Sequence, residues 1–149
     1  MNINRRKLLC GTLGLSASVV FGVNKAFAEA ADVEAAIEAI AAGNEVGEGT
    51  ITLKAPEIAE NGNSVPVAVT VDSPMTEDSY VESVSLFADG NPNPEVITFN
   101  FTPASGEAFA STRMRLAKTQ NVVAVAKMSD GTVFSDTSNV KVTIGGCGG

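Results

Sequence analysis

The spacing of hydrophobic residues predicts one helix followed by a long region of strands. Over residues 29–42, Val33, Ile37 and Ile40 recur at helical spacing, and Gly43-Asn44 follows as a stop signal. We therefore expect an N-terminal amphipathic helix whose acidic residues lie near its positive end or on its outer face.

After residue 49 the period changes to two, which is typical of half-buried strands. The alternation predicts about seven short strands, separated by turns rich in Gly, Pro and Asn, at residues 50–53, 65–71, 80–87, 97–101, 110–116, 121–128 and 133–144.

Three local signals add detail to this pattern. Residues 121–128 form a nearly continuous apolar run, which is typical of a central strand, and Asp130-Gly131 predicts a hairpin turn. Pro66 has no backbone N–H, so its strand is expected at a sheet edge or beside a bulge. Seven strands at this spacing predict an all-β protein, an immunoglobulin-like β-sandwich with an N-terminal helix and a flexible C-terminal tail.

Residues 1–28 have the pattern of a cleaved signal peptide. Arg5-Arg6 begins a charged segment, an apolar stretch follows that is short for a membrane span, and Ala26-Phe27-Ala28 supplies small residues for a signal peptidase. The paired arginines favour the twin-arginine export route over an ordinary secretory leader. We therefore expect a periplasmic protein with one domain over residues 29–144.

Charge and composition exclude several classes of function. Without residues 1–28 the chain keeps 6 Lys or Arg and 17 Asp or Glu, a formal charge of −11. Such a surface repels phosphate backbones and anionic lipid, so neither nucleic acid nor membrane is an expected partner. Histidine is absent, which removes His-based triads, general bases and metal ligands, and we expect no cofactor and no metal site.

The C-terminus, Gly145-Gly146-Cys147-Gly148-Gly149, contains the chemistry that we single out. Four of its five residues have no side chain to bury, so the pattern predicts a mobile arm from Gly145 onward. Cys147 is the only thiol after the leader, and an unpaired Cys in an exported chain indicates intermolecular pairing or a free thiol. A solvated thiol has a pKa of about 8.5 and no base lies nearby in sequence, so Cys147 is better suited to attachment than to catalysis.

Three classes of function fit this tail. The first is a non-catalytic carrier that holds a group covalently on Cys147 and presents it to other enzymes. The second is a structural periplasmic sandwich with an intermolecular disulfide, including a Cys147-linked homodimer, and the third is a thiol enzyme. Arg113, Arg115 and Lys118 form a basic cluster that could hold an anionic group or a partner, or simply be a solvated strand face.

The body and tail together resemble the SoxY family of sulfur carriers from the bacterial thiosulfate-oxidising system. The resemblance lies in residues 53–62, 65–67, 72–75, 91–94, 111–117 and 123–126, in the ending 145–149, and in the twin-arginine leader. It implies an immunoglobulin-like fold, a heterodimer with a SoxZ-like β-sandwich subunit, and thiosulfate attached to Cys147 as a cysteine S-thiosulfonate.

The resemblance also implies enzymes that act on the loaded carrier. A haem-containing enzyme would couple thiosulfate to Cys147, a hydrolase would release sulfate, and a sulfane dehydrogenase, where present, would oxidise the remaining sulfur.

Overall fold

The computed structural model describes residues 30–146 of the 149-residue chain. It contains one α-helix, nine strands and a 3₁₀ turn in these residues. In chain order they are α1 (Ala30–Ala41), β1 (Val46–Gly47), β2 (Ile51–Lys54), β3 (Ile58–Asn61), β4 (Val65–Val71), β5 (Val81–Ala88), β6 (Glu95–Asn100), η1 (Pro103–Ser105), β7 (Ala108–Met114), β8 (Gln120–Met128) and β9 (Val133–Ile144).

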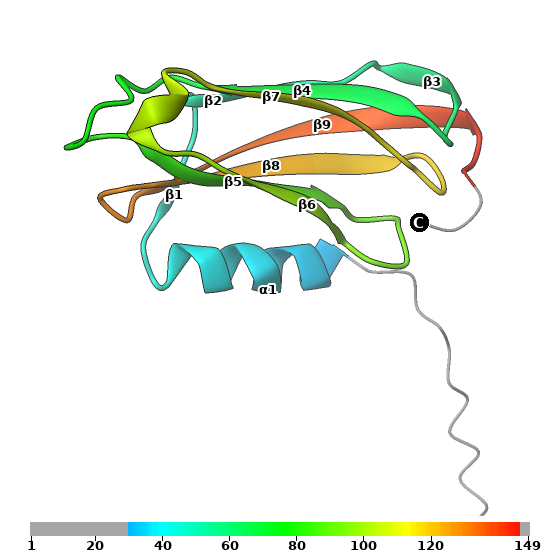
Figure 1. Cartoon of the computed structure of the whole chain (residues 1–149). Helices are drawn as coiled ribbons and strands as arrows, with labels where there is room; N and C mark the ends of the chain where they lie inside the picture. The colour runs from blue at the N-terminus through cyan, green and yellow to red at the C-terminus, as the bar shows by residue number, and fades with distance from the viewer. Residues whose placement is uncertain (1–29, 147–149) are drawn as a thin grey trace, which may run out of the picture.

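Two sheets pack face to face, and the helix lies against the outer side of the larger one (Figure 1). The larger sheet has the order β1-β9-β8-β5-β6, with β3 also paired to β9, and the smaller has the order β2-β4-β7. The chain thus passes from the small sheet at β2 to the large sheet at β3, where it runs parallel to β9. This arrangement confirms the predicted immunoglobulin-like β-sandwich with an N-terminal helix.

The alternating residues that predicted the strands form the core between the sheets. In β4, Val65, Val67, Val69 and Val71 are all buried, whereas the residues between them are exposed or half-buried. They pack against the inward side chains of β5, β7 and β8 in one continuous cluster. The strand pattern therefore determines which face of the small sheet meets the large one.

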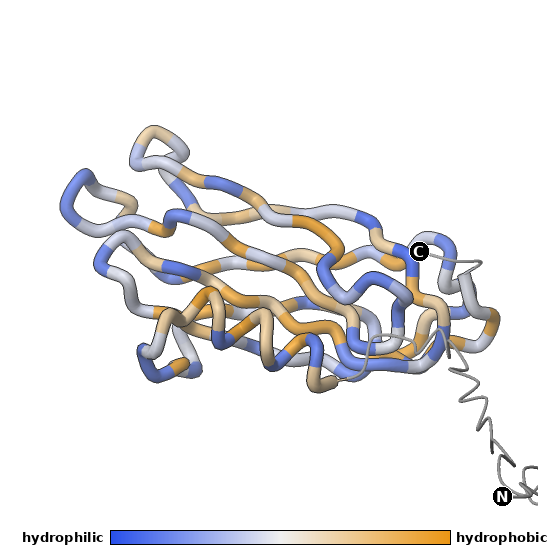
Figure 2. Tube along the Cα trace, turned by 90° about the horizontal axis from the view of Figure 1, so that it is seen from below, coloured by the Kyte–Doolittle hydropathy of each residue, from blue (hydrophilic) through white to orange (hydrophobic). Residues whose placement is uncertain are grey.

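A second, smaller cluster holds α1 on the outside of the large sheet. Val33 and Ala41 are buried against large-sheet residues that include Phe87 and Val125, while Ile37 and Ile40 are half-buried beside them. Figure 2 shows hydrophobic positions along the strands that the helix covers. The predicted helix is confirmed, with bounds one residue shorter at each end.

All seven predicted strands are present, and β8 is a central strand as its apolar run indicated. The sequence missed β1 and β3, because two and four residues are too few to show a period. Pro66 lies in the middle strand of the small sheet, so the prediction of an edge strand is wrong. The register of β2 ends opposite Ala68, so β4 has no second neighbour beside Pro66, and a missing N–H is tolerated there.

The hairpin between β8 and β9 turns at Asp130-Gly131, as predicted. Gly131 has a φ of 86°, a conformation that favours glycine, and its N–H donates to the carbonyl oxygen of Met128. The carboxylate of Asp130 accepts hydrogen bonds from the hydroxyl and the N–H of Thr132, which lower its pKa from the ordinary value.

Candidate functional site

The end of the sandwich at which β9 stops brings together segments that are far apart in sequence. Figure 1 shows the β3–β4 turn and the β7–β8 loop at the same end of the molecule as the end of β9. Residues 145–146 continue from β9 into this group of loops, so the path of the chain towards Cys147 is determined here.

A series of backbone hydrogen bonds ties the start of the tail to the body. The N–H of Gly62 donates to the carbonyl oxygen of Ile144 at 2.7 Å, and the N–H of Leu116 donates to that of Gly62 at 2.8 Å. The N–H of Gly146 in turn donates to the carbonyl oxygen of Leu116 at 2.9 Å. Leu116 is fully buried, so the tail is bonded to a fixed point of the core.

These backbones approach so closely that the glycines are a steric requirement. A Cβ atom on Gly62 would overlap the carbonyl oxygen of Leu116, and one on Gly145 would overlap that of Ala117. A Cβ atom on Gly146 would lie 2.8 Å from the carbonyl oxygen of Gly62. Glycine is needed here because backbone meets backbone, not because of a left-handed φ.

The predicted mobile arm therefore needs a correction at its first two residues. Gly145 and Gly146 were expected to pack against nothing, yet Gly146 is buried and hydrogen-bonded, and Gly145 lies against Ala117. Composition alone indicated mobility, because the sequence cannot show that the backbones of Gly62 and Leu116 lie against the glycine backbone of the tail. Cys147, Gly148 and Gly149 lie outside the described residues.

A buried pair of amide side chains supports the β7–β8 loop, to which the tail is hydrogen-bonded. Asn91 donates from Nδ2 to the carbonyl oxygen of Arg115 at 2.8 Å, and its Oδ1 accepts from the N–H of Ala117 at 3.0 Å. The same Oδ1 accepts from Nε2 of Gln120 at 3.0 Å, and Oε1 of Gln120 accepts from the N–H of Gly90 at 2.7 Å. Asn91 is 3% exposed and Gln120 is 5% exposed, so these bonds are made out of solvent.

Sequence reasoning missed both amides of this pair. Asn91 was recognised as part of a Gly-Asn-Pro turn signal and of the family resemblance, but not as a buried hydrogen-bonding residue, and Gln120 precedes an apolar strand without any motif of its own. The partners in the four bonds given above are 24 to 30 residues away, a separation that no local pattern reveals.

We expect Asn91→Ala to lower the free energy of unfolding by about 2–4 kcal/mol, because several buried groups lose their partner at once. Asn93→Ala, an exposed Asn two residues away, is the matched control and should change stability by less than about 0.5 kcal/mol. Urea unfolding measures both, and amide exchange at Gly146 should rise only in the Asn91 variant. Equal stability of the two variants would contradict a supporting role for the pair.

The structure places the basic cluster beside this anchor. Arg113 and Arg115 are exposed residues at the end of β7, and Lys118 is exposed in the loop that follows. The guanidinium of Arg113 donates to the hydroxyl of Ser64 at 3.4 Å, and no described acidic side chain forms an ion pair with Arg113 or Arg115. These two arginines are therefore solvated on this face, and no described carboxylate pairs with them.

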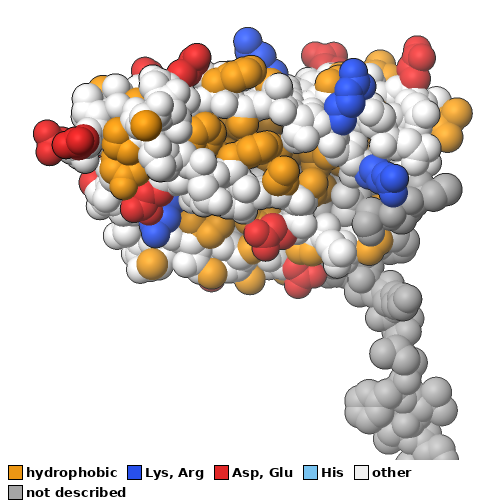
Figure 3. Space-filling view, viewed as in Figure 1, with side chains coloured by type: hydrophobic (Ala, Val, Ile, Leu, Met, Phe, Trp, Pro, Cys, Tyr) orange, Lys and Arg blue, Asp and Glu red, His pale blue; other side chains and the backbone are white. Residues whose placement is uncertain are grey.

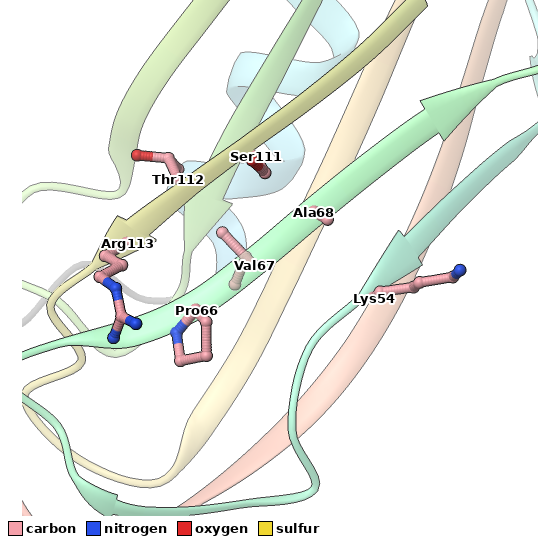
Figure 4. Close-up of a pocket in the computed structure, with 7 residues that line it drawn as sticks. All are labelled: Lys54, Pro66, Val67, Ala68, Ser111, Thr112 and Arg113. Carbon is pink, nitrogen blue, oxygen red and sulfur yellow. The ribbon is translucent and has the colours of Figure 1, made fainter.

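Arg113 also lines a shallow groove on the outer face of the small sheet, together with Lys54, Pro66, Val67, Ala68, Ser111 and Thr112. Figure 4 shows that the side chain of Lys54 extends away from Pro66, whereas Arg113 lies on the other side of that proline. The two cations do not converge on one point, so the groove lacks the geometry of an anion site.

The described residues contain neither a metal-binding cluster nor a membrane-spanning helix. Within residues 30–146 no group of three or more Cys, Asp or Glu side chains is arranged to hold a metal ion. In that part of the chain no helix has the length and apolarity needed to cross a bilayer.

Comparison with known sequences and structures identifies the family. The sequence model of sulfur oxidation protein SoxY matches residues 36–147, three quarters of the chain, and the match includes Cys147. The chain belongs to the SoxY family. A solved SoxY, the sulfur carrier protein from Chlorobium limicola f thiosulfatophilum, is 37% identical with a TM-score of 0.64, over 78% of this chain and 100% of that one. None of the curated protein sequences matches significantly.

Members of a second group share the SoxY fold at lower identity. A superoxide reductase (neelaredoxin) from Ignicoccus hospitalis is 21% identical with a TM-score of 0.56, over 63% of this chain and 80% of that one. A putative superoxide reductase from Thermotoga maritima is 20% identical with a TM-score of 0.54, over 66% and 87%. At these identities the likeness shows the sandwich alone and carries no activity to this chain.

Proposed function

We propose that this protein is a non-catalytic carrier that holds thiosulfate-derived sulfur on Cys147 and presents it to the enzymes of sulfur oxidation. The observation that carries the proposal is the anchor of Gly146 on Leu116, one residue before the only thiol after the leader. The body thereby holds the base of the tail in a defined place. The solved family member that covers 78% of this chain is itself described as a sulfur carrier protein.

The loading step requires a second enzyme. The Cys147 sulfur would form a disulfide-type bond with the terminal sulfur of thiosulfate, the thiol proton would go to solvent, and the haem-containing coupling enzyme would accept the two electrons released. Water then attacks the sulfonate sulfur of the cysteine S-thiosulfonate, and sulfate leaves while a persulfide stays on Cys147. A sulfane dehydrogenase, where present, oxidises that persulfide sulfur further.

The carrier works in the periplasm after export by the twin-arginine pathway, in a heterodimer with a SoxZ-like β-sandwich subunit. Arg5-Arg6 and the small residues at 26–28 support the route. The sandwich supports the partnership, because it leaves strands at its sheet edges for a second chain.

Intact mass spectrometry of the protein from cells grown on thiosulfate tests the proposal. We expect a fraction of the molecules to gain the mass of one thiosulfate or of one sulfur atom, and a thiol reductant to remove the addition. A structural protein would instead give only the free thiol and a Cys147-linked dimer, and turnover by the isolated chain would indicate a thiol enzyme.

The basic residues beside the anchor should favour anionic reagents at Cys147. Arg115 precedes Leu116, to which Gly146 is bonded, so its charge lies close to the origin of the tail. We expect Arg115→Gln to slow the reaction of Cys147 with an anionic aromatic disulfide about twofold relative to a neutral dipyridyl disulfide.

The matched control for this measurement is Lys127→Gln, at the opposite end of β8, where Lys127 forms an exposed ion pair with Glu82 at 3.4 Å. It removes the same charge and should leave the ratio of the two rates unchanged. A ratio that moves equally in both variants would mean that only net charge matters.

A further inference from the structure

The two sheets of the sandwich do not close on the side formed by β6 and β7. β6 is the last strand of the large sheet and β7 the last of the small sheet, so each has one unpaired edge. Figure 3 shows hydrophobic side chains gathered across the middle of this side of the molecule. We call this region the β6–β7 seam, formed by residues 96–101 and 108–112.

Residues of the seam that face the core are only partly covered. Ile97 and Phe99 lie opposite Leu86 and Val84, both fully buried, so their side chains point between the sheets. Each is nevertheless half-buried, as is Ala110 across the gap on β7. The edge of the hydrophobic core is therefore open to solvent along this line.

Beyond its first residue, the exposed Glu95, β6 lacks the features that protect exposed strand edges from pairing. Residues 96–101 contain no charged residue, no Pro and no Gly in a chain whose mature charge is −11. The other edges differ, since β1 has only two residues, β2 ends in Lys54, β3 contains Glu60, and β7 contains Arg113. Among the edge strands in the described residues, β6 and β7 have the longest uncharged runs, residues 96–100 and 108–112, and the one charge of β6 lies at its first residue.

We propose that β6 binds an edge strand of a second, different β-domain protein, which extends the large sheet and covers the β6–β7 seam. A row of unpaired backbone groups needs an extended strand as its partner, and the open seam needs apolar side chains at alternate positions of that strand. A second copy of this chain would bring two bodies of charge −11 together, so a neutral or basic protein fits better.

Hydrogen exchange with the purified SoxZ-like subunit tests the surface directly. We expect the amides of residues 96–100 to exchange more slowly in the complex, and those of β2 and β3 to be unchanged. Protection confined to β2, β3 or β9 would overturn the proposal, and so would protection of β6 in the isolated chain as its concentration rises, because the occupant would then be a second copy.

Two lysine substitutions test the same proposal through the affinity for the SoxZ-like subunit. Asn100→Lys adds a cation at an exposed position of β6, and Val96→Lys adds one at a half-buried position, so the first remains informative if the second folds poorly. Each should weaken binding of the subunit at least about tenfold. Thr52→Lys on β2 adds the same charge to an exposed site of another edge strand and should leave affinity within about twofold.

The choice of the SoxZ-like subunit as the probe rests on the proposed function. The identification of β6 as a binding surface does not depend on that function. Sulfur adducts on Cys147 are measured by mass without this subunit. The two proposals can therefore fail separately. A carrier without the β6 interface would show the adducts but no protection of β6, and a protein that carries no sulfur could still show protection of β6. If both lysine variants bind the subunit with wild-type affinity, the proposed interface is wrong and the carrier proposal is unaffected.

Discussion

Cys147→Ser should abolish covalent sulfur loading completely, while the free energy of unfolding stays within about 0.5 kcal/mol of wild type. Cys147 is the only cysteine in residues 29–149, and a serine hydroxyl cannot form the sulfur–sulfur bond that loading requires. Intact mass spectrometry after incubation with thiosulfate and the coupling enzyme measures the first effect, and urea unfolding the second.

Gly149→Ala is the control for this variant, because it alters the same tail and keeps the thiol. We expect it to load as wild type does. A serine variant that still gains the mass of thiosulfate would place the attachment elsewhere and contradict the carrier proposal.

Gly62→Ala should produce the largest loss of stability among single methyl additions at this end of the sandwich. The new Cβ would overlap the carbonyl oxygen of Leu116 and lie 2.8 Å from the nitrogen of Gly146. Both are backbone atoms, so no rotamer change relieves the contact, and we expect a cost of about 1–3 kcal/mol.

The same substitution should release the base of the tail. If Gly146 loses its position on Leu116, its amide exchanges faster and Cys147 becomes a less defined target for the coupling enzyme. Glu60→Ala, an exposed change two residues earlier on β3, is the matched control and should alter stability by less than about 0.5 kcal/mol. Unchanged exchange at Gly146 in the Gly62 variant would mean that the tail is not held through this contact.

Local sequence was sufficient for the elements that have a clear period. The helical spacing of Val33, Ile37 and Ile40 and the alternation along β4 are direct consequences of which side chains must leave water. The Asp130-Gly131 turn followed from its backbone preferences. Together with the family pattern of the tail, these features were enough for the fold class and for Cys147 as the candidate site.

The anchor of the tail could not be read from the sequence. Gly62, Asn91 and Leu116 belong to three different loops or turns, and only the packing of the two sheets brings them to one end of the molecule. For the same reason Gly145 and Gly146 were predicted to be mobile, although glycine is required there by close backbone contact.

The sequence by itself determined the helix, seven of the nine described strands, the acidic net charge and the single cysteine of residues 29–149, because each depends on nearby residues or on composition. Tertiary structure alone decided where the tail is anchored, which edge stays open and why Pro66 is accepted in a middle strand. Those features depend on contacts between backbone groups that are far apart in sequence. Such contacts form only when the two sheets pack, so residue type alone does not predict them.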